Sequence, residues 1–263
     1  MTALDLDTVL HRCDACVPPA WGHTWELGSA AFWPHLARSA APASHRLADS
    51  LPAELVACIL GGFGVLGDVG IAAFAALRRD GVLTTAQSAD ERADTISTLL
   101  RQPMPIPGRP RPVRYRFWRQ RGRRIADALA LLEQWRGNPD LDPALAPDAR
   151  EMRDRLLAIP GVGPKTASWT VRNHLDSDDV AIIDIHIARA GVTAGLFCRY
   201  WRLPNDYARY EQAFLSWSQA AEVRASTLDA VIWRTLADLG PHGDTLLGAP
   251  RTVITGRQRP AHA

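Results

Sequence analysis

A single lysine, Lys165, stands among the 30 basic residues of this chain, and the other 29 are arginines. A skew toward arginine and alanine is typical of a GC-rich genome, so the one lysine that remains is informative. Arginine can replace lysine as a surface charge but not as an amine nucleophile, because a guanidinium stays protonated whereas a buried ammonium can lose its proton. We therefore predict that Lys165 is a nucleophile, with a lysine that survives by chance as the alternative.

Lys165 follows a tight glycine turn in the segment 156–169, which reads LLAIPGVGPKTASW. Gly161 and Gly163 let the backbone approach a partner closely, and Pro164 suits the first position of a helix. The segment therefore predicts two short helices joined by a hairpin, with backbone N–H groups at a positive helix end that can bind a phosphate. A nucleotide-binding P-loop is excluded, because the glycine spacing differs and no glycine directly precedes the lysine.

Asp184 is a second candidate for chemistry and lies nineteen residues after Lys165. Its carboxylate can cap the N–H groups of residues 186 and 187 at the start of a helix, where the helix dipole favours a negative charge. A purely structural N-cap is the alternative for Asp184 taken alone. His186, in the first turn of the same helix, could donate to a phosphate, and a packed or solvated histidine is an equal alternative.

Between residues 109 and 124 the chain carries eight arginines and no acidic residue, with three aromatic residues interleaved. The net charge is only +2, so any binding to nucleic acid must come from a local group of charges such as this one. Each phosphate contact there would release condensed counterions. We predict contacts to a DNA backbone, with a solvated loop as the alternative, and we assign them to Arg114, Arg116, Arg119 and Arg123.

Helical periodicity dominates the sequence and predicts an all-α protein, with 180–183 as a segment that could be briefly extended. Thr85, Asp148 and Gly240 provide start and stop signals. The first 50 residues hold three tryptophans and predict short helices packed on the rest. The other expected helices lie near 51–60, 68–80, 86–101, 117–136, 148–158, 164–175, 184–195, 205–222 and 226–239.

These elements predict a two-lobed helical bundle. One lobe would span residues 50–176 and end in the hairpin, and the second would combine residues 1–49 with residues 177–263. Lys165 and Asp184 would face each other across the cleft between the lobes, which would be the active site. The Pro/Arg stretch at 103–112 would be an exposed connection on the surface.

The composition, with 47% hydrophobic and 22% charged residues, is that of a soluble globular protein, and no apolar run is long enough to span a bilayer. The first residues show no basic region followed by an apolar stretch, and four cysteines in a chain of this length do not resemble a disulfide framework. We therefore expect no secretion and a reducing cytoplasm. Cys13 and Cys16 with His11 hint at metal ligation. A zinc site needs a second pair of ligands, so we predict no metal site.

The hairpin with Lys165, followed by Asp184 and His186, resembles the helix–hairpin–helix (HhH-GPD) DNA glycosylase superfamily. A lysine on the second hairpin helix marks the bifunctional members, and the likeness is greatest to the 8-oxoguanine DNA glycosylase group. The sequence shows no β-rich N-terminal domain like that of the eukaryotic enzymes, so the all-helical archaeal-type branch is nearer. The iron–sulfur cluster of the endonuclease III branch is missing, because only Cys198 follows the hairpin.

The resemblance implies a base-excision-repair glycosylase that removes an oxidised purine, 8-oxoguanine first of all, from double-stranded DNA after the damaged nucleotide has left the stack. Lys165 would attack C1′ and form a Schiff base, which permits strand cleavage by β-elimination (AP-lyase activity). Asp184 would stabilise the cationic sugar.

The resemblance also implies a base pocket in which Trp169 and Trp233 sandwich the extruded base and Asp229 accepts a hydrogen bond from its edge. The spacing agrees, because Trp169 lies one helical turn after Lys165, and Trp233 lies one turn after Asp229. Core packing is the alternative for either tryptophan.

Two other functions stay open: a glycosylase for a different modified or damaged base, and a non-catalytic hairpin module that only grips DNA. The second predicts that Lys165→Arg is nearly neutral, because only charge would matter. We expect no required cofactor, although hairpin carbonyls in this superfamily often hold a monovalent cation. We also expect a monomer without membrane contact that acts on nucleoid DNA.

Overall fold

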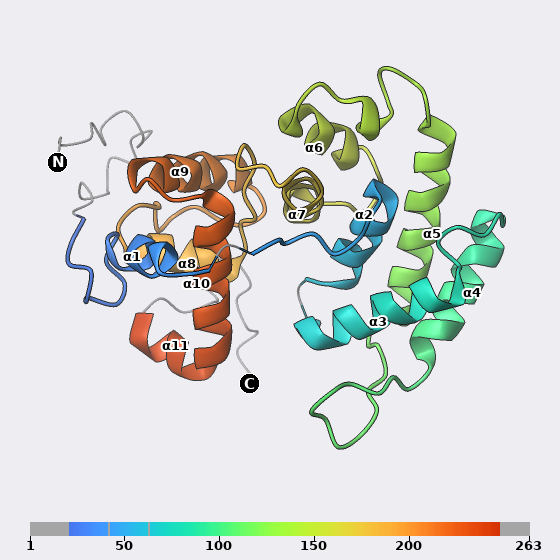
Figure 1. Ribbon diagram of the computed structural model, residues 1–263, viewed down its shortest axis with the longest axis horizontal. Helices are drawn as coiled ribbons and strands as arrows, with labels where there is room; N and C mark the ends of the chain where they lie inside the picture. The colour runs from blue at the N-terminus through green and yellow to red at the C-terminus, as the bar shows by residue number, and fades with distance from the viewer. Residues whose placement is uncertain (1–20, 42, 63, 248–263) are drawn as a thin grey trace, which may run out of the picture. The chain divides into compact units, whose positions relative to one another are not determined.

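The computed structural model describes residues 21–41, 43–62 and 64–247, and within these ranges it has eleven α-helices, one short 3₁₀ helix and no β-strand (Figure 1). The expected all-α class is therefore confirmed. Residues 181–184 have no regular structure, and an isolated bridge pairs Met104 with Val113. None of the described helices is long and apolar enough to cross a lipid bilayer. Contacts divide the chain into two compact units, residues 45–177 and residues 1–44 with 178–263.

We name residues 45–177 the hairpin unit. It consists of α2 (Leu51–Leu60), α3 (Gly67–Asp80), α4 (Ala89–Arg101), α5 (Trp118–Trp135), the 3₁₀ helix η1 (Pro143–Leu145), α6 (Ala149–Leu157) and α7 (Pro164–Leu175). Helix α5 packs along α4, and α2 packs against both α3 and α7 (Figure 1). Helix α7 therefore packs on both α2 and α6.

Local capping explains where these helices begin. Asp148 caps α6, as predicted, because its carboxylate accepts the N–H of Glu151 at 2.9 Å. The predicted start of α4 after Thr85 is wrong: the N-cap is Ser88, which forms a reciprocal capping box with Glu91. The hydroxyl of Thr85 instead donates a hydrogen bond to the carbonyl of Gly81 at 2.9 Å. A capping box is favoured over a single N-cap hydroxyl, because the box satisfies two backbone N–H groups and the hydroxyl satisfies one.

A buried carboxylate fastens α2 to other parts of the hairpin unit. Glu54 is fully buried and accepts the backbone N–H groups of Leu47 and Ala48, both at 2.8 Å. Its other oxygen accepts the side-chain amide of Asn173 in α7, also at 2.8 Å. Removing the Glu54 carboxylate would leave the buried N–H of Ala48 and the buried amide of Asn173 without this acceptor, and an unsatisfied buried donor costs about 1–3 kcal/mol.

We name residues 1–44 with 178–263 the split unit. It consists of α1 (Phe32–Arg38), α8 (Ile185–Thr193), α9 (Tyr207–Ala220), α10 (Ala225–Leu239) and α11 (Pro241–Leu247). Buried aromatic rings from separate segments form its core, with Phe197 edge-on to Tyr210 and to Trp217. Trp217 donates its indole N–H to the carbonyl of Ala30 at 3.0 Å, which fixes the early segment to α9.

The sequence patterns do not predict helix α11. Gly240 ends α10, as expected, with a φ of 52°. Pro241 then begins a new helix, since proline is welcome at a first helical position. The glycine is therefore a corner between two helices.

Candidate functional site

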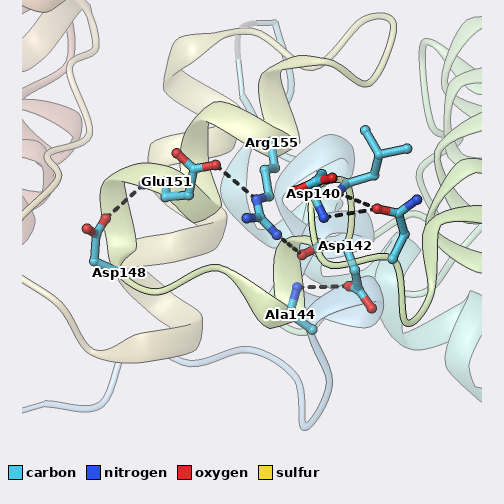
Figure 2. A network of polar contacts seen from close by, with 8 residues as sticks. Asp140, Asp142, Ala144, Asp148, Glu151 and Arg155 are labelled. Carbon is cyan, nitrogen blue, oxygen red and sulfur yellow. Dashed lines mark hydrogen bonds and ion pairs between the residues drawn. The ribbon is translucent and has the colours of Figure 1, made fainter.

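The first helix of the hairpin, α6, is anchored by a network of polar contacts (Figure 2). Arg155 of α6 donates to Glu151 at 3.0 Å and to the carbonyl of Asp142 at 2.8 Å. The Asp142 carboxylate accepts the N–H groups of Gly137 and Ala144, which fixes the loop before η1. The hairpin therefore begins on a rigid base that joins α6 to the chain leaving α5.

The predicted hairpin joins α6 to α7. Gly161 has a φ of 84°, a left-handed value that favours glycine, and Val162 donates its N–H to the carbonyl of Ile159 at 3.0 Å to close the turn. Gly163 is the N-cap of α7, and Pro164 occupies the first helical position, as predicted. Glycine offers no capping side chain, and the first N–H groups of a helix have no partner within it, so this end of α7 suits an anion.

Lys165 and Trp169 share a face of α7. The Nζ atom of Lys165 lies 5.8 Å from the centroid of the Trp169 ring, and both side chains are half-buried. The sequence patterns miss a third member of this group, Gly61 at the end of α2. A Cβ atom at Gly61 would lie 2.5 Å from Cη2 of Trp169, so only glycine lets the ring rest on this backbone.

Cys58 is a second potential nucleophile in this region, because its thiol is close enough to Lys165 for the two to interact electrostatically. Complete burial, reinforced by the nearby negative charge of Glu54, raises the pKa of the Cys58 thiol far above its ordinary value. The thiol therefore stays protonated, and a protonated thiol is a poor nucleophile.

Asp184 is the N-cap of α8. Its Oδ1 accepts the N–H of His186 at 2.8 Å and the N–H of Ile187 at 3.0 Å, the two groups predicted from the sequence. The side chain is largely buried, and one carboxylate oxygen makes both bonds. Helix α8 therefore holds this carboxylate in one orientation. His186 is partly buried.

Helix α10 carries the other predicted base-pocket residues. Leu228, Ile232 and Leu236 are buried in the core of the split unit. Asp229 is also buried, whereas Trp233 is 45% exposed. Core packing is therefore excluded for Trp233, which leaves a large aromatic surface open to a partner.

The start of α10 depends on Asp178, a residue that the sequence patterns did not single out. Arg224, the N-cap, makes no side-chain cap, but Asp178 accepts the N–H of Ser226 at 2.8 Å and the Arg224 guanidinium at 2.6 Å. Burial alone raises the pKa of the Asp178 carboxyl, but the bonds from Arg224 and Ser226 outweigh burial and lower it. No local sequence signal reveals a cap that comes from 48 residues earlier in the chain.

The arginine-rich segment contains arginines that pair with carboxylates and arginines that lie over aromatic rings or are exposed. Arg109 pairs with Asp68, and Arg123 pairs with Asp90 and Asp127, so the charge of Arg123 is already neutralised within the protein. Arg116 and Arg119 lie over the rings of Phe117 and Trp118, and Arg114 is exposed. The interleaved Tyr115 is a core residue that donates to the carbonyl of Leu60 at 2.7 Å, and burial raises its pKa to about 12.

The candidate metal ligands His11, Cys13 and Cys16 lie outside the described residues. Within the described ranges, no group of three or more histidine, cysteine or acidic side chains could hold a metal ion. Cys58 and Cys198 are buried free thiols.

Comparison with known proteins agrees with the hairpin assignment. The family model for 8-oxoguanine DNA glycosylase matches residues 48–223, about two thirds of the chain. Two solved structures are similar to the chain. The 8-oxoguanine DNA glycosylase of Methanocaldococcus jannaschii is 25% identical, with a TM-score of 0.50 over 70% of this chain and 77% of that chain. The 8-oxoguanine DNA glycosylase of Thermotoga maritima is 22% identical, with a TM-score of 0.51 over 71% and 79%, and it supports the fold.

No curated protein matched the chain. The family match covers the hairpin, Lys165, Asp184 and the arginine-rich segment, and it ends before α10 begins. We conclude that the chain belongs to the 8-oxoguanine DNA glycosylase family and is a DNA-repair glycosylase for 8-oxoguanine.

Proposed function

We propose that this glycosylase is bifunctional, with Lys165 as its nucleophile and an AP-lyase step after base removal. The observation that carries the proposal is the position of the chain's single lysine, at the second residue of α7 beside Trp169. A non-catalytic grip on phosphate would be served equally well by arginine, the residue this chain uses at every other basic position.

The proposed reaction begins once the damaged nucleotide has left the stack. The neutral Lys165 amine attacks C1′ of the deoxyribose, and the bond between C1′ and the base breaks, so that the base leaves with the bonding electrons and takes up a proton. The nitrogen lone pair then expels O4′, which takes up a proton from water, and the opened sugar is left as a protonated Schiff base between the amine and C1′. Loss of a C2′ proton then expels the 3′ phosphate, and water releases the lysine.

In this proposal the Asp184 carboxylate stabilises the positive charge that develops on the sugar as the base departs. Its fixed orientation supports this role, because a preorganised charge needs no reorganisation during the reaction. Trp169 and Trp233 stack on the extruded base, and Asp229 accepts from its edge. The hairpin at Gly161 and Gly163, with His186, Arg114, Arg116 and Arg119, contacts the DNA backbone. Arg123 contributes only if DNA displaces its two carboxylate partners.

Members of this family need no cofactor, and no step above uses one. A monovalent cation on the hairpin is compatible with the local backbone. The carbonyls of Ile159 and Gly163 each accept one N–H, from Val162 and Ala167, and a carbonyl oxygen has a second lone pair. We also infer that the protein acts as a monomer on nucleoid DNA, which a sedimentation measurement with and without duplex would test.

The decisive experiment is borohydride trapping on a duplex that contains 8-oxoguanine. We expect wild type to give a covalent protein–DNA adduct, Lys165→Gln to give none, and Lys165→Arg to bind DNA without excising the base. Trapping by Lys165→Gln would disprove the role of this lysine. Excision by wild type without an adduct would show a monofunctional enzyme that uses water. Excision of a different base, on a panel of lesion duplexes, would change the assigned substrate but not the proposed reaction mechanism.

A further inference from the structure

One arginine of α5 lies directly over the turn of the hairpin. A Cβ atom at Gly161 would lie 2.9 Å from Nε of Arg124 and 3.1 Å from its Cδ, so the arginine side chain crosses the α-carbon of this glycine. Gly161 is exposed, and Arg124 is half-buried. A ligand that reaches the backbone of the turn therefore also meets the side chain of Arg124.

Arg121 places a second positive charge close to that of Arg124. Arg121 is one turn before Arg124 on the same helix, and it is half-buried beside Tyr115. Burial and the like charge of Arg124 lower the pKa of Arg121 despite the opposing effect of Tyr115. Its Nε is buried, with no hydrogen-bond acceptor among the described residues.

The surroundings of these two residues differ from those of their neighbours. Arg109 and Arg123 have carboxylate partners, whereas within the described part of the chain no carboxylate lies at ion-pair distance from Arg121 or Arg124. Two adjacent guanidinium groups without a counter-charge repel each other, and partial burial strengthens the repulsion. An anion bound at this point would relieve that repulsion.

The adjacent hairpin favours the same kind of ligand. The N-terminal end of α7 carries partial positive charge, and its N-cap, Gly163, makes no side-chain cap. The planar fork of an arginine matches the oxygen atoms of a phosphate, which it can bind through two parallel hydrogen bonds. Both elements therefore select a phosphate group.

We propose that Arg124 binds a phosphate of the DNA strand held by the hairpin turn, and that Arg121 is a half-buried second charge that strengthens this site. The proposal rests on the proposed role of the hairpin in DNA binding. It gives Gly161 a second purpose, since any side chain there would occupy the space that Arg124 needs.

The test is the salt dependence of DNA binding by the full chain, measured by fluorescence anisotropy with an 8-oxoguanine duplex. Loss of one phosphate contact lowers the slope of log K against log salt concentration by about 0.9. We expect Arg124→Gln to show this loss and to bind about tenfold more weakly near 0.1 M salt, because hydrogen bonds between charged groups are strong. Arg124→Lys should keep the slope, because it keeps the charge.

The matched control is Arg136→Gln, which removes the same charge just beyond the other end of α5. An unchanged slope in Arg124→Gln would overturn the proposal, and so would an equal loss in Arg136→Gln, which would reveal a general effect of net charge. A loss of slope in Arg124→Lys as well would indicate a structural role and would also overturn it. If wild type failed to bind DNA or to excise the base, the proposed function itself would fail, which is a different result.

Discussion

The hairpin and helix α10 carry different parts of the proposed site, and they are supported in different ways. The hairpin lies inside the region that matches the family, and its geometry comes from local features: a left-handed glycine, a proline at the first position of α7, and an α6 helix capped by Asp148. Helix α10 lies beyond the match, and its start is held by Asp178 from a distant part of the sequence. The residues proposed for attack on the sugar therefore belong to the family region, whereas Asp229 and Trp233, proposed to read the base, belong to a part in which this chain can differ.

The comparison predicts the largest loss for Asp184→Asn, among variants that keep the lysine. Asparagine is also a good N-cap, so helix α8 should stay folded. Removing the charge that stabilises the developing cation should lower the single-turnover rate of excision by roughly 10²–10³-fold, as for other preorganised electrostatic groups. Rapid-quench measurement of base release gives this rate. A loss below tenfold, with thermal stability unchanged, would reduce Asp184 to a structural cap.

Trp169→Ala and Trp233→Ala compare the two regions directly. Stacking on an extruded base is worth about 1–3 kcal/mol, so each variant should lose roughly 5–150-fold in kcat/KM for the 8-oxoguanine duplex. Because Trp233 is 45% exposed, its removal should leave the melting temperature nearly unchanged. Equal activity in Trp233→Ala and wild type would show that α10 provides no stacking surface for the base. Trp169 would then be the only one of the two tryptophans that stacks on it.

Gly61→Ala should have a smaller effect that depends on Trp169. Alanine fits the backbone angles at this position, but its Cβ would lie 2.5 Å from Cη2 of Trp169, so the ring must move. We expect a several-fold loss of kcat/KM in the wild-type background, of the order of 1 kcal/mol. In the Trp169→Ala background the same substitution should be nearly neutral, which a double-mutant cycle would measure. Additive losses in the cycle would show that Gly61 acts independently of this ring.

The smallest effect is expected for Asp178→Asn, on stability. Losing the charged cap of α10 should lower the free energy of unfolding by about 1 kcal/mol at pH 7. Since the folded protein lowers the pKa of Asp178 below its usual 3.8, this stabilisation is fully present above that value and disappears as the pH falls through the lowered pKa. Urea unfolding at neutral and acidic pH would check this. A difference between the two proteins that persisted unchanged at about pH 2 would contradict the assignment.

Features encoded by neighbouring residues could be predicted from the sequence. The helices other than α11, the cap of α8 by Asp184 and the turn at Gly161 depend on spacing within a few positions. The start of α4 was placed three residues too early because two candidate caps, Thr85 and Ser88, lie close together and only one forms the reciprocal box.

The features that depend on distant residues could not be predicted. Arg123 belongs to a segment without acidic residues, yet Asp90 of α4 reaches it across the packing of two helices. The next residue, Arg124, points in a different direction, because its side chain lies against Gly161 of the hairpin. Likewise, no pattern around Gly61 reveals that a tryptophan 108 positions later rests on it. These contacts decide which of the predicted arginines and tryptophans are available to DNA.

The three hydrogen bonds of Glu54 have a topological consequence. They bring Leu47 and Ala48, where the chain has just entered the hairpin unit, to the same carboxylate as Asn173, shortly before the chain leaves it. The two ends of the segment 45–177 therefore meet at one carboxylate, which is the topology of a domain inserted into another domain. An inserted domain can be replaced by a homologous one through two junctions that lie close together. Chimeras between relatives can therefore be made by exchanging residues 45–177.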